Sequence, residues 1–160
     1  EMSASLVGSE MCIRDRNNGR KTMKNIETQY KLKVEFYDLD PMNVVWHGNY
    51  LKYLEAARCD MLEKIGYTYD DMKKDGFAYP VAKMELKYIK PCTFSQELVV
   101  TSTILEVEPA LSIKYVIRDA VTDKKVFEAK SLQICLNYKT METVYEAPEG
   151  FLAGLEKYGK

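Results

Sequence analysis

The amino-acid sequence predicts an α+β domain in which one long helix packs against an antiparallel sheet. The order of the predicted elements supports this class. A strand-like segment near the start is followed by one long helical pattern, and four strand-like segments then precede a short C-terminal helix. The 160 residues are enough for one domain with its own hydrophobic core. No repeat, low-complexity tract or linker divides the chain, so we expect a single domain.

The first regular segment is "YKLKVEFY", residues 30–37, in which apolar and charged residues alternate. This period of two is typical of a strand with one buried face. The predicted inward residues are Leu32, Val34 and Phe36, and the predicted outward residues are Lys31, Lys33 and Glu35.

The long helix is predicted over "NYLKYLEAARCDMLEKI", with Asn49 as a plausible N-cap and Gly66 as the stop. Its apolar residues recur at helical spacing: Tyr50, Leu54, Ala57, Met61 and Ile65. At ~1.5 Å per residue the helix would be about 25 Å long, which is enough to cross a small sheet. Glu55 and Arg58 are three residues apart, a spacing typical of a surface ion pair.

Four further segments have strand character, at residues 81–89, 96–108, 111–119 and 125–138. Short turn-like stretches separate the last three, and the pattern predicts an antiparallel meander. The last segment is mostly apolar and could be a central strand buried on both faces. In the tail, Pro148 stands near a helix start, and Phe151, Leu152 and Leu155 form an apolar edge.

Composition and charge restrict the partners. A net charge of −1 gives no global reason to expect nucleic acid or an anionic membrane. No apolar run approaches the ~18–20 residues that span a bilayer. We interpret Cys59, Cys92 and Cys135 as small buried hydrophobes in a reducing cytoplasm, because none of them has a C-x-x-C partner. For the same reason, and with one histidine in the chain, no metal site is expected.

Residues 1–22 differ in character from the rest of the chain. They contain no apolar core of a secretory signal and no helical or strand periodicity. The stretch "LVGSEMCIRDR", Leu6–Arg16, matches the peptide obtained by translating a sequencing-library adapter in one frame. We therefore expect residues 1–22 to be a non-native or disordered extension and residues 23–160 to be the domain.

The polar stretch "YDLDPMNVVWHGNY" lies directly before the long helix and allows two interpretations. Asp40 could simply cap a short turn, because Pro41 favours a first helical position. Asp38 is expected to be a turn or capping residue, and Trp46 is expected in the core. His47 could pair with a carboxylate or make a local hydrogen bond.

The second interpretation is a reaction centre. A helix N-terminus exposes unpaired N–H groups and a partial positive charge. The backbone amides of His47 and Gly48 could therefore hold a carbonyl oxygen as it becomes an oxyanion. Asp40 could sit opposite and either deprotonate water or attack the carbonyl carbon. No G-x-S-x-G elbow and no glycine-rich phosphate loop offers another chemistry, so the constellation favours hydrolysis of an activated acyl group.

The stretch "DLDPMNVVWHGNYLKYLEAAR" resembles the signature of hotdog-fold acyl-CoA thioesterases of the 4-hydroxybenzoyl-CoA thioesterase and YbgC type. The resemblance covers Tyr30–Tyr138. It implies one long central helix wrapped by a curved antiparallel sheet of about five strands. It also implies a homodimer or homotetramer with active sites at the subunit interface.

By position in the motif, the resemblance implies that Asp40 is the catalytic carboxylate. It implies that the backbone N–H of His47 polarises the thioester carbonyl, and that the His47 side chain can contribute directly. Asn49 and Tyr50 continue the signature and would line the helix entrance, as substrate-binding residues. Relatives usually carry glycine where this chain has Met42-Asn43, a difference that bears on loop shape and acyl-chain fit.

The stretch "AYPVAKMELKYIKP" resembles the family segment that borders the acyl pocket. It makes Tyr79, Pro80 and Met84 pocket candidates, with a role in the strand core as the alternative. Three lysines of this segment could meet the phosphates of CoA as point charges, unless they form a solvated strand face: Lys83, Lys87 and Lys90.

The function we predict is hydrolysis of an acyl-CoA or acyl-carrier-protein thioester to the free acid and the thiol. The CoA thioester is the substrate, and no cofactor is expected. Two alternatives remain: a hotdog dehydratase or hydratase acting on a 3-hydroxyacyl chain, and a non-catalytic acyl-binding hotdog dimer. Either alternative would keep the fold without thioester hydrolysis.

Overall fold

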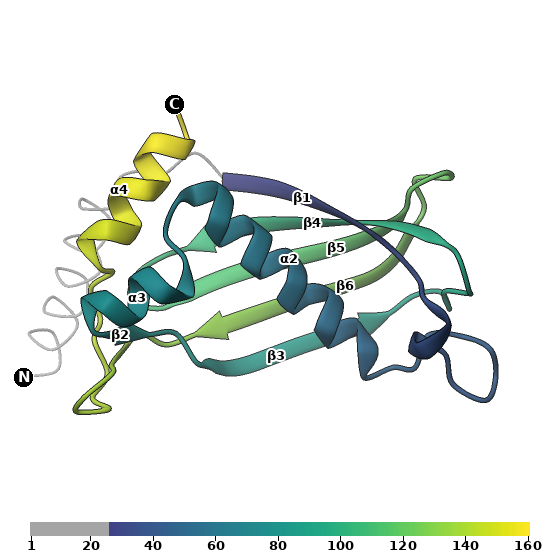
Figure 1. Cartoon of the computed structure of the whole chain (residues 1–160), viewed down its shortest axis with the longest axis horizontal. Helices are drawn as coiled ribbons and strands as arrows, with labels where there is room; N and C mark the ends of the chain where they lie inside the picture. The colour runs from purple at the N-terminus through teal and green to yellow at the C-terminus, as the bar shows by residue number, and fades with distance from the viewer. Residues whose placement is uncertain (1–25) are drawn as a thin grey trace, which may run out of the picture.

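The computed structural model describes residues 26–160, and the predictions for residues 1–22 lie outside this range. A long helix, α2, crosses one face of a five-stranded antiparallel sheet with the order β1-β4-β5-β6-β3 (Figure 1). The predicted α+β class is therefore confirmed. The sheet strands are β1 (Ile26–Lys33), β3 (Val81–Tyr88), β4 (Glu97–Glu106), β5 (Leu111–Asp119) and β6 (Lys125–Gln133).

The other elements are the helices and a second, smaller sheet. The helices are η1 (Phe36–Asp38, a 3₁₀ turn), α2 (Asn49–Ile65), α3 (Tyr69–Asp75) and α4 (Glu149–Tyr158). A separate two-stranded sheet pairs β2 (Phe77–Ala78) with β7 (Leu136–Asn137). Within the described part of the chain, no helix combines the length and the apolar character needed to cross a bilayer. The sequence did not predict α3, β2 or β7 as elements.

The first strand lies earlier in the chain than predicted. β1 pairs with β4 from Ile26, opposite Ile104, to Lys33, opposite Glu97, where β4 begins. Val34 still makes backbone hydrogen bonds to Ser95 and Gln96, just before β4, and the chain then turns into η1. Phe36, predicted to point inward, is 76% exposed. The alternation of apolar and charged residues thus continues in the sequence beyond the last residue of β1 that pairs with β4.

The bounds predicted for α2 are confirmed. Its buried face carries the predicted residues Leu54, Ala57, Met61 and Ile65, and it contacts β1 and β4. Gly66 ends the helix with φ of 81°, and its amide donates to the carbonyls of Leu62 and Glu63 at 3.0 Å. The predicted N-cap is wrong by one residue: Gly48 is the cap, and Asn49 is the first helical residue.

The meander contains three strands, β4, β5 and β6, and β3 pairs with β6 instead of β4. The segment 89–96 carries the chain from the β3 edge of the sheet to β4, which lies next to the opposite edge strand, β1. It contacts the loop before α2, where the Val45 amide donates to the Cys92 carbonyl at 2.9 Å. β6 therefore lies one strand from the edge. It is not buried on both faces as predicted, because Lys130 points to solvent.

The C-terminal helix α4 begins after Pro148, as predicted, and buries Phe151 and Leu155. It packs on the C-terminal end of α2. A Cβ atom on Gly154 would lie 2.7 Å from the carbonyl oxygen of Ile65, so only glycine permits this approach. α4 therefore covers the end of α2 that lies away from the polar stretch (Figure 1).

Candidate active site

The polar stretch forms a tight hairpin-like loop between η1 and α2. Leu39 bridges to Val45, and the Asp40 amide donates to the Val44 carbonyl at 2.9 Å. Asn43 lies at the tip with φ of 61°, a left-handed conformation that asparagine tolerates better than most residues. The loop thus has a defined shape, set by its own backbone hydrogen bonds.

Asp40 has two carboxylate oxygens in different environments. Oδ1 accepts hydrogen bonds from the amides of Met42 at 2.8 Å and Val44 at 3.4 Å. This is the turn-capping role that the sequence suggested. Oδ2 accepts no hydrogen bond from any residue between 26 and 160, and the side chain is partly exposed. One oxygen therefore holds the carboxylate in place, and the other makes no hydrogen bond within the described residues.

The N-terminus of α2 lies directly after this loop. Among the described residues, the amides of His47 and Gly48 donate no hydrogen bond. The first turn of the helix contains no acidic side chain, so no carboxylate of its own neutralises the positive end of the helix dipole. Two unpaired amides and an uncompensated dipole form a site for a carbonyl oxygen or an anion.

Trp46 covers this helix end, although the sequence predicted it in the core. It is 48% exposed, and its ring centroid lies 4.9 Å from that of His47. A Cβ atom on Gly48 would approach the indole to 2.2 Å. Gly48 is therefore required so that the ring can lie against the backbone, and the core prediction for Trp46 is wrong.

His47 is fixed by its backbone more than by its side chain. Its carbonyl oxygen accepts a hydrogen bond of 2.7 Å from the hydroxyl of Tyr88, the last residue of β3. The imidazole itself is exposed. Tyr88 thus connects the edge of the sheet to the helix tip, a role that the sequence did not reveal. The alternation of β3 indicated the direction of its side chain, but not its partner.

Asn49 and Tyr50, the predicted substrate-binding residues, have buried side chains. The Asn49 amide group donates to the Asp38 carbonyl at 2.9 Å. The Tyr50 ring stacks on Phe127 with centroids 4.7 Å apart, and burial raises the pKa of its hydroxyl. Both residues support the helix entrance from inside, and a direct contact with substrate stays a prediction.

The sequence assigned Asp38 to a turn or cap, and this is confirmed in part. Its carboxylate accepts the Glu35 amide at 3.0 Å at the start of η1. The same oxygen, Oδ2, also accepts the hydroxyl of Tyr53 at 2.8 Å, and Asp38 is only 5% exposed. The sequence gave no sign that Tyr53, on α2, reaches back to this residue.

The pocket candidates in and just before β3 do not lie together at the helix tip. Tyr79 packs against Phe151 of α4, with ring centroids 5.9 Å apart, before the start of β3. Tyr88 ends the strand seven residues after Val81, about 23 Å away at ~3.3 Å per residue. Pro80 is at the Tyr79 end, and Met84 is half-buried in mid-strand on the same face as Tyr88. Their pocket role stays a prediction.

The three candidate lysines are exposed. Lys83 and Lys87 alternate with Met84 and Tyr88 along β3, so they point to the opposite face of the sheet. Lys83 pairs with Glu85 at 2.7 Å. Lys90 follows the strand, in the crossing segment. The structure does not bring these lysines to the helix tip in one subunit, and their contact with CoA phosphates stays a prediction.

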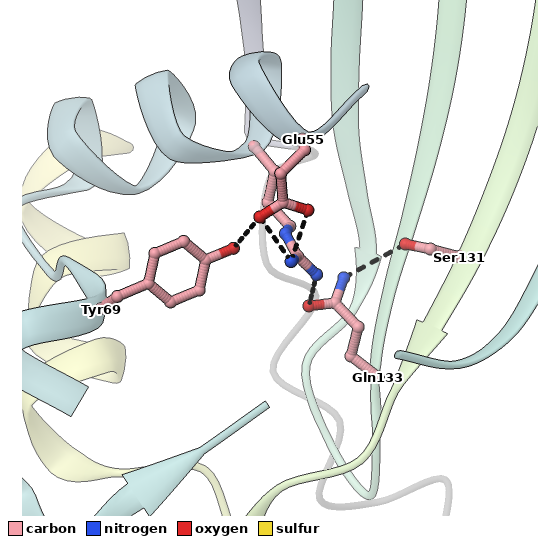
Figure 2. Close-up of polar contacts among 5 residues, drawn as sticks. Glu55, Tyr69, Ser131 and Gln133 are labelled. Atoms are coloured by element: carbon pink, nitrogen blue, oxygen red, sulfur yellow. Dashed lines mark hydrogen bonds and ion pairs between the residues drawn. The ribbon is translucent and has the colours of Figure 1, made fainter. Parts of the chain in front are cut away.

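The predicted pair of Glu55 and Arg58 forms, and only its Glu55 side lies at the surface, with a side chain 52% exposed. Arg58 is only 9% exposed and donates to Glu55 at 2.7 and 2.8 Å and to Gln133 of β6 at 2.7 Å. Figure 2 shows Tyr69 donating to Glu55, and Gln133 reaching Ser131. The network joins α2, α3 and β6, and so it holds the helix on the sheet.

The cysteines fit their prediction with one difference. Cys92 and Cys135 are buried, and burial raises the pKa of both thiols, whereas Cys59 is only half-buried. Within residues 26–160, no three His, Cys, Asp or Glu side chains gather in a way that could hold a metal ion.

The fold and the site together define a hotdog-type domain with a carboxylate loop at the N-terminus of its central helix. The sequence model of the Thioesterase-like superfamily matches residues 34–155, and the chain belongs to this superfamily. The hotdog fold that the motif implied is thereby confirmed.

Two curated relatives are similar over most of their length. A Bacillus subtilis protein described provisionally as the acyl-CoA thioesterase YneP is 29% identical over 72% of this chain and 93% of its own. The long-chain acyl-CoA thioesterase FadM of Escherichia coli is 28% identical over 72% of this chain and 88% of its own. The solved 1,4-dihydroxy-2-naphthoyl-CoA thioesterase from Synechocystis superposes with a TM-score of 0.75 at 18% identity, covering 81% and 96% of the two chains.

Proposed function

We propose that the protein is a thioester hydrolase that converts an acyl-CoA into the free acid and CoA. One observation carries this proposal: a carboxylate with one fixed and one free oxygen lies on a loop fastened to a helix end with two unpaired amides. Membership of the Thioesterase-like superfamily and the names of the relatives support the same reaction.

The helix tip would bind the thioester carbonyl. In the transition state the carbonyl oxygen gains negative charge, and the amides of His47 and Gly48 would donate hydrogen bonds to it. Donors that already point at that position need no reorganisation during the reaction, and this is why such sites stabilise the transition state strongly. The uncompensated dipole of α2 adds to the stabilisation.

Asp40 would act through Oδ2 in one of two ways. As a general base it takes a proton from water, whose oxygen bonds to the carbonyl carbon before the C–S bond breaks and the thiolate leaves. As a nucleophile it bonds to the carbonyl carbon itself, expels the thiolate and forms a mixed anhydride, which water then hydrolyses. In both routes the whole cycle consumes one water and regenerates Asp40: the oxygen of water enters the carboxyl group of the product acid or of Asp40, and one proton reaches the thiolate. The exposed imidazole of His47 would orient the site or assist this proton transfer.

The edge of the sheet supports a dimer. β3 is an eight-residue edge strand whose residues are nearly all exposed, including Val81, Leu86 and Tyr88. An exposed edge strand presents a row of free N–H and C=O groups that can recruit another strand. We propose that two copies pair along β3, with a homotetramer as the larger alternative. Since Tyr88 bonds to His47, the partner would border the helix tip.

Several expectations from the sequence accompany the proposal. The substrate would be an acyl-CoA or an acyl-carrier-protein thioester, and the reaction as written needs no cofactor. A cytoplasmic location and the absence of nucleic-acid and membrane partners stay predictions.

A thiol-release assay over a panel of acyl-CoAs tests the function. The panel should include short, branched, aromatic, long-chain and 3-hydroxyacyl groups, and both the thiol and the acyl product should be measured. Release of free CoA from at least one member is expected. Water loss from the 3-hydroxyacyl chain without thiol release would identify a dehydratase. Binding of acyl-CoA with no product of either kind would identify a non-catalytic acyl-binding protein.

A further inference from the structure

A buried carboxylate two residues before Asp40 contacts the loop and the helix at the same time. Asp38 is 5% exposed, and its Oδ2 accepts the Tyr53 hydroxyl at 2.8 Å. Its backbone carbonyl accepts two more donors at 2.9 Å, the Asn49 side chain and the Trp46 amide. One residue therefore binds to the segment just before the helix tip, to the first helical residue and to the second turn of α2.

The burial of this carboxylate costs free energy that an apolar residue would not incur. Among the described residues Asp38 has no positively charged partner, and its carboxylate accepts from neutral donors only. Hydrogen bonds to an ionised acceptor are about twice as strong as neutral ones, so they offset part of the desolvation cost. Such an arrangement defines a position sharply, because the oxygen must stay where both donors reach it.

The hydrogen bonds of Asp38 connect α2 to the loop that carries Asp40. From Asp38 the chain continues through the Leu39–Val45 bridge to Asp40, whose amide bonds to Val44. The other arm of the loop ends at the helix tip. The position of Asp40 relative to the tip therefore depends on how the base of the loop is attached to α2.

We propose that Asp38, Tyr53 and Asn49 form a positioning cluster that sets the distance between Asp40 and the oxyanion amides. This inference rests on the proposed function and adds residues that act through Asp40 without touching the substrate. Since a shift of about 1 Å at reacting groups can cost about 100-fold in rate, loosening the cluster affects turnover more than substrate binding.

Tyr53→Phe is the decisive variant, because it removes one hydroxyl and keeps the ring. We expect kcat to fall about 10-fold to 100-fold while KM changes less than about 3-fold. The matched control is Tyr69→Phe, which removes a hydroxyl that donates to Glu55 of the same helix at 3.0 Å, away from the loop. It should leave kcat within about 2-fold of the parent.

A second pair of variants tests the carboxylate. Asp38→Asn keeps an oxygen that can accept from Tyr53 and the Glu35 amide, whereas Asp38→Ala removes it. We expect asparagine to restore much of the turnover that alanine loses. If Asp38→Ala fails to fold, Tyr53→Phe alone decides the question.

A readout without substrate separates this proposal from the proposed function. The amides of Met42 and Val44 bond to Asp40, and their hydrogen exchange should be faster in Tyr53→Phe than in the parent and in Tyr69→Phe. If the parent cleaves no thioester but this exchange difference appears, the function is wrong and the cluster still positions the loop. If Tyr53→Phe keeps the kcat and exchange rates of the parent, or if Tyr69→Phe changes them equally, the positioning cluster is wrong.

Discussion

The two interpretations that the sequence offered for Asp40, a turn cap and a catalytic carboxylate, are compatible with each other in this structure. Oδ1 of Asp40 caps the loop through the Met42 and Val44 amides, and its Oδ2 stays unbonded among the described residues. The capping bonds fix the carboxylate without consuming both oxygens. A structural role for this residue is therefore no argument against a catalytic one.

Asp40→Asn should reduce kcat by about 100-fold or more, since an amide can neither remove a proton from water nor attack a thioester efficiently. The fold should persist, because the amide oxygen can still accept from Met42 and Val44. Thiol release and thermal unfolding measure the two effects. Asp70→Asn, at an exposed position of α3, is the control for the charge change. Parent-like hydrolysis by Asp40→Asn would remove Asp40 from the mechanism.

At the scale of elements, α2 presents its N-terminus to the site, and its position depends on contacts along its length. The Arg58 network connects it to β6 and α3 (Figure 2). Gly154 lets α4 approach its other end. The tip of α2 is thus held by the loop and by Tyr88, whereas the Arg58 network and α4 hold the middle and the C-terminal end of the helix.

Arg58→Met should destabilise the fold by about 1–3 kcal/mol, because it leaves the Gln133 side-chain oxygen buried without its donor. The control is Lys64→Met on the same helix, whose pair with Asp60 is partly solvated. It should cost less than about 1 kcal/mol. Urea unfolding followed by circular dichroism compares the two midpoints. Equal losses would mean that Arg58 acts like an ordinary surface cation.

At the scale of the whole molecule, the sheet is open at β3. If two copies pair there, Leu86→Glu places a charge on each edge and should shift the protein towards monomers. Turnover should fall as well, because the partner would border the helix tip. Val121→Glu is the control, since Val121 is exposed in the turn between β5 and β6. Light scattering coupled to size exclusion gives the masses, and a parent that is monomeric, or a dimer unaffected by Leu86→Glu, would contradict the pairing.

The sequence predicted those features that depend on local periodicity. The predicted bounds of α2, Asn49 to Ile65, were correct, because its apolar stripe and Gly66 are both local signals. The predicted bounds of β1 lay too far along the chain, because alternation does not show where the neighbouring strand ends. For the same reason the pairing of β3 with β6 could not be read from either strand alone.

For the candidate site as well, features that are local in sequence could be predicted and long-range contacts could not. Asp40, His47 and Gly48 could be proposed together because the loop and the helix start are adjacent in sequence, and their catalytic role stays a prediction. Tyr53 and Tyr88 were missed, because their hydrogen bonds join residues 15 and 41 positions apart. Trp46 was placed in the core on the basis of its size, but its ring instead covers Gly48.

The position of Trp46 has a practical consequence. It is the only indole in the chain, and it lies half-exposed against the helix end where the carbonyl would dock. All tryptophan fluorescence therefore originates at that single place. A non-hydrolysable acyl-CoA analogue that displaces water there would change the emission spectrum, so the protein carries its own optical probe of occupancy.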